Sequence, residues 1–332
     1  MMDLSIICTY RCISKCRMCN IWQNPSNPKD ELSLETLAKL PKGLGHVNIQ
    51  GGEPTLRADL MEIIDTVYPK ARVTEISSNG LLPDRLVPII KKYPRVKVRV
   101  SLEGDEKTNN RIRGESDGFK TKVEGLKKLK AAGGKDLGFA IVVQDENASQ
   151  LASVYEAAKS IGADFSASAL HNGWQFHKAD NCLRDQATAA REIEKTITAF
   201  IRSNSIKSWF RAYMILGLRK QIMGHDPSEK CTAGTGFAFI DPWANVFACN
   251  VRADLLMGNL RKQSWEDILS SSAVRRCRTQ VVQCEKKCWK VVNARVAMRS
   301  ALIPRFPKFG TIRWVVTNKI RAAIGLDVLF DH

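Results

Sequence analysis

The sequence predicts an α/β protein with a parallel β-sheet, followed by a smaller cysteine-rich module. Strand-like and helix-like runs alternate about six times in the first half of the chain, which is typical of parallel strands joined by right-handed helical crossovers. The length of 332 residues suits one large domain with a smaller one attached. Most of the ten cysteines gather in two groups, one near the start of the chain and one beyond residue 230.

The expected strands are short apolar runs over residues 3–8, 46–50, 72–77, 95–102, 137–143 and 164–170. The expected helices between them cover residues 33–40, 58–67, 83–92, 119–132 and 148–161. Ser33 precedes the first helix and is a favourable N-cap residue. Residues 1–183 are therefore expected to form the core domain.

Two amphipathic helices are expected within residues 185–223, in a bridging segment over 184–228. The cysteine-rich module then covers residues 229–292. It begins with a hairpin-like stretch, GFAFIDPWANVFAC, whose turn lies at residues 241–245. A further helix starts at Ser264, and residues 293–332 form a tail.

The first group of cysteines is Cys12, Cys16 and Cys19, with the spacing CxxxCxxC. Three thiolates on one short loop can hold three irons of a [4Fe–4S] cube and leave the fourth iron open to a ligand. A structural cluster would use four cysteines, and a structural zinc site normally shows two separated pairs of ligands. The alternative is that three thiols lie close together by chance in a reduced protein.

Four further motifs follow or end strand-like runs. They are GGEP at residues 51–54, SSNG at 77–80, RVSLEG at 99–104 and RIRG at 111–114. Glycine in such a turn lets the backbone approach a ligand closely.

With Trp22 just after the triplet and GGEP about thirty residues later, the chain resembles the radical S-adenosylmethionine (SAM) superfamily. The resemblance implies a partial (β/α)6 TIM-like barrel with its site at the C-terminal ends of the strands. It also implies that SAM binds the open iron, is cleaved by one electron, and yields a 5′-deoxyadenosyl radical that abstracts hydrogen from the substrate.

The resemblance assigns the SAM contacts as well. Glu53 is expected to accept a hydrogen bond from the SAM amino group, within the turn formed by Gly51, Gly52 and Pro54. The other expected contacts, to the methionyl and ribose groups, are Asn79, Ser101, Glu103 and Arg113. Glu103 and Arg113 could instead be surface ions.

The second group of cysteines resembles the C-terminal SPASM or shorter twitch domain of radical SAM enzymes. Too few cysteines follow Cys249 for two auxiliary clusters, so one auxiliary [4Fe–4S] cluster is expected. Cys277 either replaces one of its ligands or is not a ligand. Zinc is the alternative occupant. The expected cluster ligands are Cys231, Cys249, Cys284 and Cys288.

Two residues depart from the pattern of the relatives. Ala244 replaces a glycine, and Asn250 replaces an acidic base of sulfatase-maturing enzymes, which disfavours that reaction. The auxiliary cluster could accept an electron from the substrate radical or clamp the module to the barrel. Epimerisation would instead need a hydrogen-atom donor, for which Cys277 or Cys182 are candidates.

The chain is basic, with a formal net charge of +17, and attracts anionic partners. Its tail mixes apolar and basic residues, among them Phe306, Trp314 and Arg313, without an apolar run of the roughly 20 residues that span a bilayer. Such a helix could lie in an anionic membrane interface or pack on the barrel. With no room for a signal peptide before the first strand, we expect a cytoplasmic protein, peripheral at the inner face of the membrane.

The leading hypothesis is thus a radical SAM enzyme that abstracts hydrogen from an unactivated C–H bond. The outcome would be oxidation, epimerisation or bond formation on a lipid, lipid-linked or sugar-like substrate, with flavodoxin or ferredoxin as reductant. No peptide-binding domain is seen before the barrel, which disfavours a peptide substrate, and nucleic acid is not expected because no RNA-binding signature is present. The alternatives are an iron–sulfur electron carrier or sensor, and a radical SAM enzyme that modifies a peptide or RNA.

Overall fold

One nine-stranded sheet runs through the protein, in the order β6-β5-β4-β3-β2-β1-β7-β8-β9. The computed structural model describes residues 1–226, 231–286, 288–292, 294–296 and 310–330. The strands are β1 (Asp3–Ile7), β2 (Leu44–Gln50), β3 (Ala71–Ser78), β4 (Lys97–Ser101), β5 (Asp136–Val143), β6 (Asp164–Ala169), β7 (Phe237–Ile240), β8 (Asn245–Phe247) and β9 (Leu256–Asn259).

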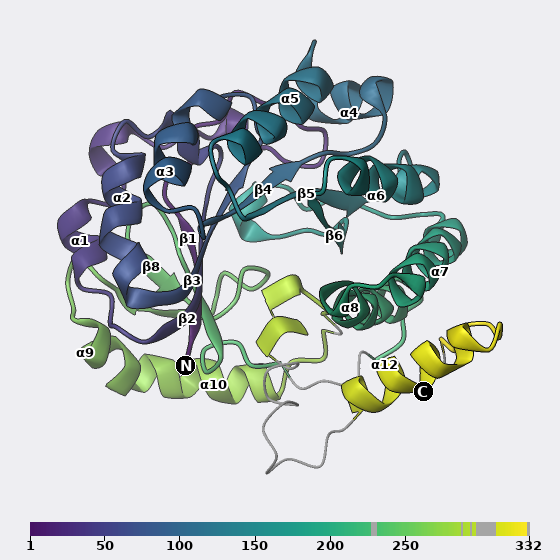
Figure 1. Cartoon of the computed structure of the whole chain (residues 1–332). Helices are drawn as coiled ribbons and strands as arrows, with labels where there is room; N and C mark the ends of the chain where they lie inside the picture. Colours follow the sequence, from purple (N-terminus) through teal and green to yellow (C-terminus); the bar gives the residue numbers. More distant parts are fainter. Residues whose placement is uncertain (227–230, 287, 293, 297–309, 331–332) are drawn as a thin grey trace.

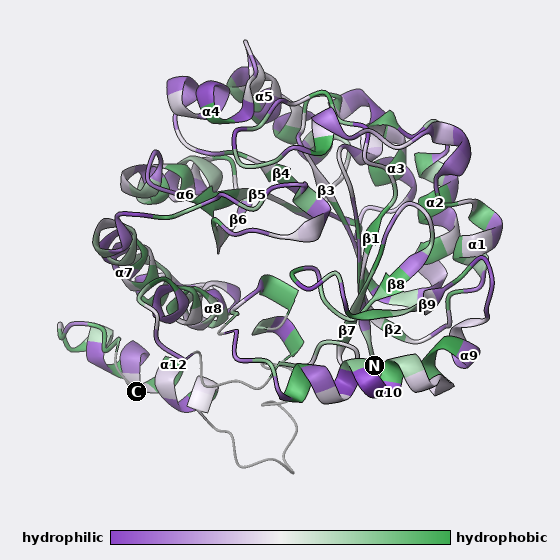
Figure 2. Ribbon diagram, turned by 180° about the vertical axis from the view of Figure 1, so that it is seen from behind, coloured by the Kyte–Doolittle hydropathy of each residue, from purple (hydrophilic) through white to green (hydrophobic). Residues whose placement is uncertain are grey.

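Strands β1 to β6 pair in sequence order, and all five pairings are parallel. This confirms the predicted sheet and the partial-barrel class. Apolar strand residues such as Ile6, Val47 and Ile76 are completely buried. The helices between the strands surround the sheet (Figure 1), and hydrophobic and hydrophilic residues are interspersed along them (Figure 2).

The helices of the barrel are α1 (Leu34–Ala38), α2 (Leu60–Val67), α3 (Val87–Lys92), α4 (Glu106–Arg113), α5 (Gly118–Ala131) and α6 (Leu151–Ser160). Ser33 caps α1 as predicted, because its side chain accepts a hydrogen bond from the backbone N–H of Thr36. Helix α4 was not predicted, because its mostly polar sequence lacks an apolar period. Asp105 caps its start, and Gly114 ends it in the left-handed conformation.

The C-terminal module continues the barrel sheet. Strand β7 pairs with β1 in parallel, and β8 and β9 follow as antiparallel neighbours. The expected hairpin is present, but its attachment to β1 was not predicted. Ala244 lies in the hairpin turn with φ of 68°, a conformation that favours the glycine of the relatives. Asp241 holds this turn by accepting hydrogen bonds from the N–H groups of Trp243 and Asn245.

The remaining helices are α7 (Gln186–Arg202), α8 (Ile206–Ile222), α9 (Trp265–Ser270), α10 (Ser272–Val282) and α12 (Gly310–Ala323). The tail helix α12 packs against α7 and α8. Trp314 is buried there, and the Lys319 ammonium donates to the carbonyls of Ile201 and Ser203. Phe306 lies outside the described residues. Within the described ranges, no helix is both long and apolar enough to cross a membrane.

Candidate active site

A cavity of about 290 Å³ lies at the C-terminal ends of the parallel strands. Cys12, Cys16 and Cys19, on the loop after β1, all border it. Its walls also include residues at the ends of β2 to β6, namely Gln50, Ser77, Ser78, Ser101, Val142 and Ser168. The structure therefore brings the first group of cysteines to the end of the barrel where such folds carry their sites.

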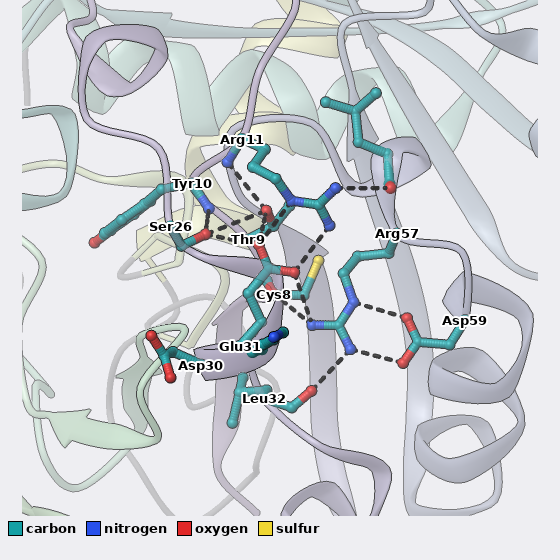
Figure 3. Close-up of polar contacts among 12 residues, drawn as sticks. Cys8, Thr9, Tyr10, Arg11, Ser26, Asp30, Glu31, Leu32, Arg57 and Asp59 are labelled. Carbon is teal, nitrogen blue, oxygen red and sulfur yellow. Dashed lines mark hydrogen bonds and ion pairs between the residues drawn. The ribbon is translucent and has the colours of Figure 1, made fainter.

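We call the segment after β1 that carries Cys12, Cys16 and Cys19 the cysteine loop. A buried carboxylate, Glu31, holds the start of this loop (Figure 3). It accepts hydrogen bonds from Thr9 Oγ1 at 2.5 Å, from Ser26 Oγ at 2.7 Å, and from Nε and Nη2 of Arg11, each at 2.9 Å. Arg57 adds an ion pair at 3.3 Å. Burial alone would raise the pKa of Glu31, but these hydrogen bonds lower it overall.

A second carboxylate, Glu115, holds the middle of the same loop. It accepts a hydrogen bond from Ser14 Oγ at 2.6 Å and forms an ion pair at 2.5 Å with Lys122, which is completely buried. Gly114, with φ of 63°, lies against the loop, since a Cβ there would be 2.6 Å from the carbonyl oxygen of Lys15. The RIRG motif is thus a helix end that packs on the cysteine loop.

Gly51 and Gly52 border the cavity. Their missing side chains make room for protein backbone, because a Cβ would lie 2.3 Å from the carbonyl oxygen of Thr9 and 2.2 Å from that of Arg11, respectively. The N–H groups of Gly52 and Glu53 donate to those same two carbonyls, at 2.7 and 2.8 Å. The space that we expected these glycines to leave for a ligand is, on the side of the missing Cβ atoms, filled by the backbone of Thr9 and Arg11.

Glu53 is completely buried and already has four hydrogen-bond donors from the protein. Oε1 accepts from the N–H and hydroxyl of Thr55 and from the Ser78 hydroxyl, while Oε2 accepts from the N–H of Asn79 at 2.6 Å. Burial raises the pKa of Glu53. Neither Glu53 nor Pro54 is among the described residues that border the cavity. The carboxylate therefore ties the GGEP turn to the SSNG turn, and the expected contact of this carboxylate with an ammonium is not supported.

Ser101 and Arg113 border the cavity, whereas Glu103 lies behind it. Glu103 accepts a hydrogen bond from the N–H of Val142 at 2.8 Å and lies 3.4 Å from Nη1 of Arg113. Burial raises the pKa of Glu103. Because Glu103 and Arg113 are 0% and 8% exposed, the alternative that they are surface ions is wrong.

Four buried polar atoms around the cavity have no hydrogen-bond partner among the described residues. They are Trp22 Nε1, Asn79 Nδ2, Arg113 Nε and His171 Nε2. Buried polar groups nearly always have partners in folded proteins. These atoms therefore suit a polar ligand with carboxylate, hydroxyl and amino groups, such as SAM.

His171 was not identified from the sequence. Its Nδ1 lies 3.0 Å from the carbonyl oxygen of Ala169, so this nitrogen carries the proton and Nε2 is left as an acceptor. Burial lowers the pKa of His171 to about 4, so the ring is neutral at physiological pH. The sequence did contain one indication of a site residue, because His171 comes just after the last expected strand of the barrel.

Four cysteines of the second group border one small pocket of the C-terminal module: Cys231, Cys249, Cys284 and Cys288. Arg252, Lys286 and Lys290 lie in the same wall and can offset thiolate charge. Asn250 and Lys290 also border the interior of the barrel.

Neither Cys277 nor Cys182 is among the described residues that border the two thiol-lined cavities. The Cys277 thiol is buried and lies 3.4 Å from the carbonyl oxygen of Leu256. Cys182 is exposed, in the segment after β6, next to Asn181, whose Nδ2 donates to the carbonyl oxygen of Met18 in the cysteine loop.

The four thiols of the C-terminal module meet at one pocket. Four sulfur ligands of one zinc ion at ~2.3 Å would lie ~4 Å from one another, whereas each cysteine around a [4Fe–4S] cube binds a different iron.

A parallel barrel with three thiols at its strand ends, and four thiols in the module that follows, define an iron–sulfur protein. Residues 6–158 match the model of the radical SAM superfamily, and residues 231–290 match the SPASM model, described as an iron–sulfur cluster-binding domain. The chain belongs to the radical SAM superfamily and carries a C-terminal SPASM domain. SAM and iron–sulfur clusters are accordingly its cofactors.

Its curated relatives have several activities. The mycofactocin maturase of Mycolicibacterium smegmatis is 26% identical over 76% of this chain, and a probable GTP 3′,8-cyclase of Sulfurisphaera tokodaii is 31% identical over 49%. This chain spans 65% and 53% of the lengths of those two proteins. The AdoMet-dependent heme synthase of Methanosarcina barkeri is 24% identical over 84% of this chain and 85% of its own length.

Solved structures share the fold. Streptococcus suis SuiB bound to S-adenosylmethionine superimposes with a TM-score of 0.62 at 19% identity, covering 88% of this chain and 73% of SuiB. The protein anSMEcpe with bound AdoMet gives a TM-score of 0.59 at 16% identity and covers 96% of this chain and 100% of its own.

Proposed function

We propose that this protein is a radical SAM enzyme that oxidises an organic substrate held inside the barrel. The observation that carries the proposal is the cavity at the strand ends, where three thiols meet four buried polar atoms that have no hydrogen-bond partner among the described residues. When bound there, a [4Fe–4S] cluster and SAM supply the 5′-deoxyadenosyl radical that abstracts hydrogen. An electron carrier or sensor would not need a cavity for SAM beside an open iron.

Each residue has a separate task in this proposal. Cys12, Cys16 and Cys19 hold the cluster that binds SAM, and Gly51 and Gly52 shape the cavity beside it. Glu53, Pro54 and Glu103 lie outside the cavity wall and position the turns after the strands that border it. Contacts to SAM come from Trp22, Asn79, Ser101 and Arg113.

Oxidation is the outcome that the second group of thiols supports. Cys231, Cys249, Cys284 and Cys288 complete the ligand set of one auxiliary cluster, which can take an electron from the substrate. Its pocket shares Asn250 and Lys290 with the interior of the barrel. Epimerisation would require a hydrogen-atom donor, and neither candidate thiol is among the described residues that border the cavity at the cysteine loop. A flavodoxin or ferredoxin is proposed as the reductant of the first cluster.

The relatives do not favour the lipid, lipid-linked or sugar-like substrate. Those named above are a mycofactocin maturase, a GTP cyclase and a heme synthase, and SuiB has also been solved with a precursor peptide. A peptide is therefore the better-supported class among our initial alternatives, and RNA gains no support.

Anaerobic reconstitution tests the proposed function. The wild-type chain is expected to bind about eight irons in two clusters and to release 5′-deoxyadenosine from SAM. Cys249→Ala is expected to lower the iron content to about four while 5′-deoxyadenosine formation persists. Cys277→Ala is the matched control and should keep about eight. Equal iron loss in both variants, or none in Cys249→Ala, would contradict the proposed ligand set.

We also propose that the protein touches anionic membranes from the cytoplasmic side through α12. Val316 and Ile320, four residues apart on α12, and Ile324, just after its last residue, are 50%, 58% and 67% exposed, and the chain is basic. Replacing all three by serine should weaken binding to anionic liposomes at least tenfold, measured by sedimentation. Val282→Ser, at an 87% exposed position on α10, is the control. Unchanged binding would refute the contact.

A further inference from the structure

A second cavity, of about 570 Å³, lies at the opposite end of the barrel from the cysteine loop. Its walls come from the first residues of β2, β3 and β4, including His46, Arg72 and Lys97, and from Ser166 of β6. Helix α8 closes one side with Lys207, Phe210, Arg211, Met214 and Ile215. This size is within the range of cavities that hold small ligands.

The two ends of the barrel are joined by a central cavity. It shares Glu75, Arg99 and Arg295 with the second cavity. It shares Ser77 and His171 with the cavity at the cysteine loop. On β3, Arg72 and Ser77 are five residues apart, which is roughly 16 Å of extended strand. A molecule of that length could place one end beside SAM and the other in the second cavity.

The second cavity has an excess of positive charge. Six cationic side chains border it against one carboxylate, Glu75, and these cations are Arg72, Lys97, Arg99, Lys207, Arg211 and Arg295.

The carboxylates just outside the wall do not balance them. Asp136 and Asp164 together form ion pairs with four of those cations. Asp136 pairs with Lys97 (3.3 Å), Arg99 (2.5 Å) and Lys207 (3.2 Å). Asp164 pairs with Arg99 (3.3 Å), Arg211 (2.7 Å) and Lys207. Asp3 pairs with Arg295 at 3.6 Å. Three carboxylates outside the wall and Glu75 thus face six cations, an excess of positive charge that favours an additional anion.

Apart from His46 and Ser166, the rest of the wall is apolar. Phe165 and Phe200 are buried at its base, and Phe210, Met214 and Val291 complete it. Inorganic anions would leave this surface unused, whereas a molecule with an apolar body would bury it.

From this arrangement we infer that the second cavity binds the anionic end of an elongated substrate, one that carries a carboxylate, as a peptide does, or a phosphate beside an apolar segment. The bound molecule is the substrate of the enzyme, an identity that rests on the proposed function. Its apolar segment packs on the phenylalanine side chains of the second cavity, and the rest of the molecule extends through the central cavity, which is lined largely by polar side chains, toward His171, where the reacting C–H bond meets SAM.

Calorimetry on the anaerobically reconstituted full chain tests this inference, with octyl phosphate and octanoate below their micellar concentrations. Wild type should bind either or both, and the stronger ligand identifies the head group. Octyl glucoside and inorganic phosphate should each bind at least tenfold more weakly than that ligand.

Variants test the location. Lys207→Gln/Arg211→Gln should weaken binding of the preferred probe at least tenfold, and Arg72→Gln, at an exposed position, should weaken it without a risk to folding. Lys159→Gln removes the same charge from the exposed face of α6 and should bind like wild type. Equal binding of octyl glucoside or inorganic phosphate, or unchanged binding in both cavity variants, would overturn the inference.

Formation of 5′-deoxyadenosine from SAM is measured on the same wild-type preparation. If SAM is cleaved but neither acidic probe binds, the inference alone fails. If a probe binds but SAM is not cleaved, the proposed function alone fails.

Discussion

Replacing Cys12 by alanine is expected to abolish the formation of 5′-deoxyadenosine. Among the described residues, three thiols border the cavity at the strand ends, so the loss of one leaves a cluster with two protein ligands that does not persist. Iron should fall from about eight to about four per chain, because the thiols of the C-terminal module lie in a separate pocket. The measurements are an iron assay and chromatography of the SAM products under anaerobic reduction.

Cys182→Ala is the control for this variant, because it removes an exposed thiol that borders neither cavity. It should retain both iron and SAM cleavage. If Cys12→Ala still cleaved SAM at a comparable rate, the cysteine loop would not hold the reactive cluster.

Glu31→Gln is expected to lower the free energy of unfolding by about 3–5 kcal/mol, the usual cost of removing one partner from a buried ion pair. The carboxylate is 6% exposed and joins Thr9, Arg11, Ser26 and Arg57. Glutamine keeps the volume but leaves two guanidinium groups without their shared anion. Thermal or urea unfolding of the metal-free chain measures the loss.

Glu35→Gln, at an exposed position on α1, is the matched control and should change stability by less than about 0.5 kcal/mol. A variant at Glu31 that unfolds like wild type would show that the network does not hold the cysteine loop.

Much of the barrel could be predicted from the sequence, because its strands are buried apolar runs separated by amphipathic helices. The six parallel strands and the cap at Ser33 follow from such local patterns. The cysteines that hold the clusters could also be proposed from the sequence, since the spacing of the ligands along the chain can be read directly. The structure places Cys231 and Cys288, 57 residues apart in sequence, at one pocket.

The remaining features depend on contacts between distant segments. Helix α4 is too polar to show a hydrophobic period, and β9 is too short. The sequence motif around Glu53 indicates a ligand contact, but only the fold shows that its oxygens are already occupied. His171 is recognised as a candidate site residue only because the fold places it at the border of the cavity.

The pairing of β1 with β7 has a consequence for electron transfer. The cysteine loop extends from β1, and Cys249 follows β8, which is hydrogen-bonded to β7 in the same sheet. The separation of the two clusters is thus set by backbone registry and not by a flexible hinge between domains. Because tunnelling slows steeply with distance, such a rigid spacing would keep the rate of electron passage uniform from one turnover to the next.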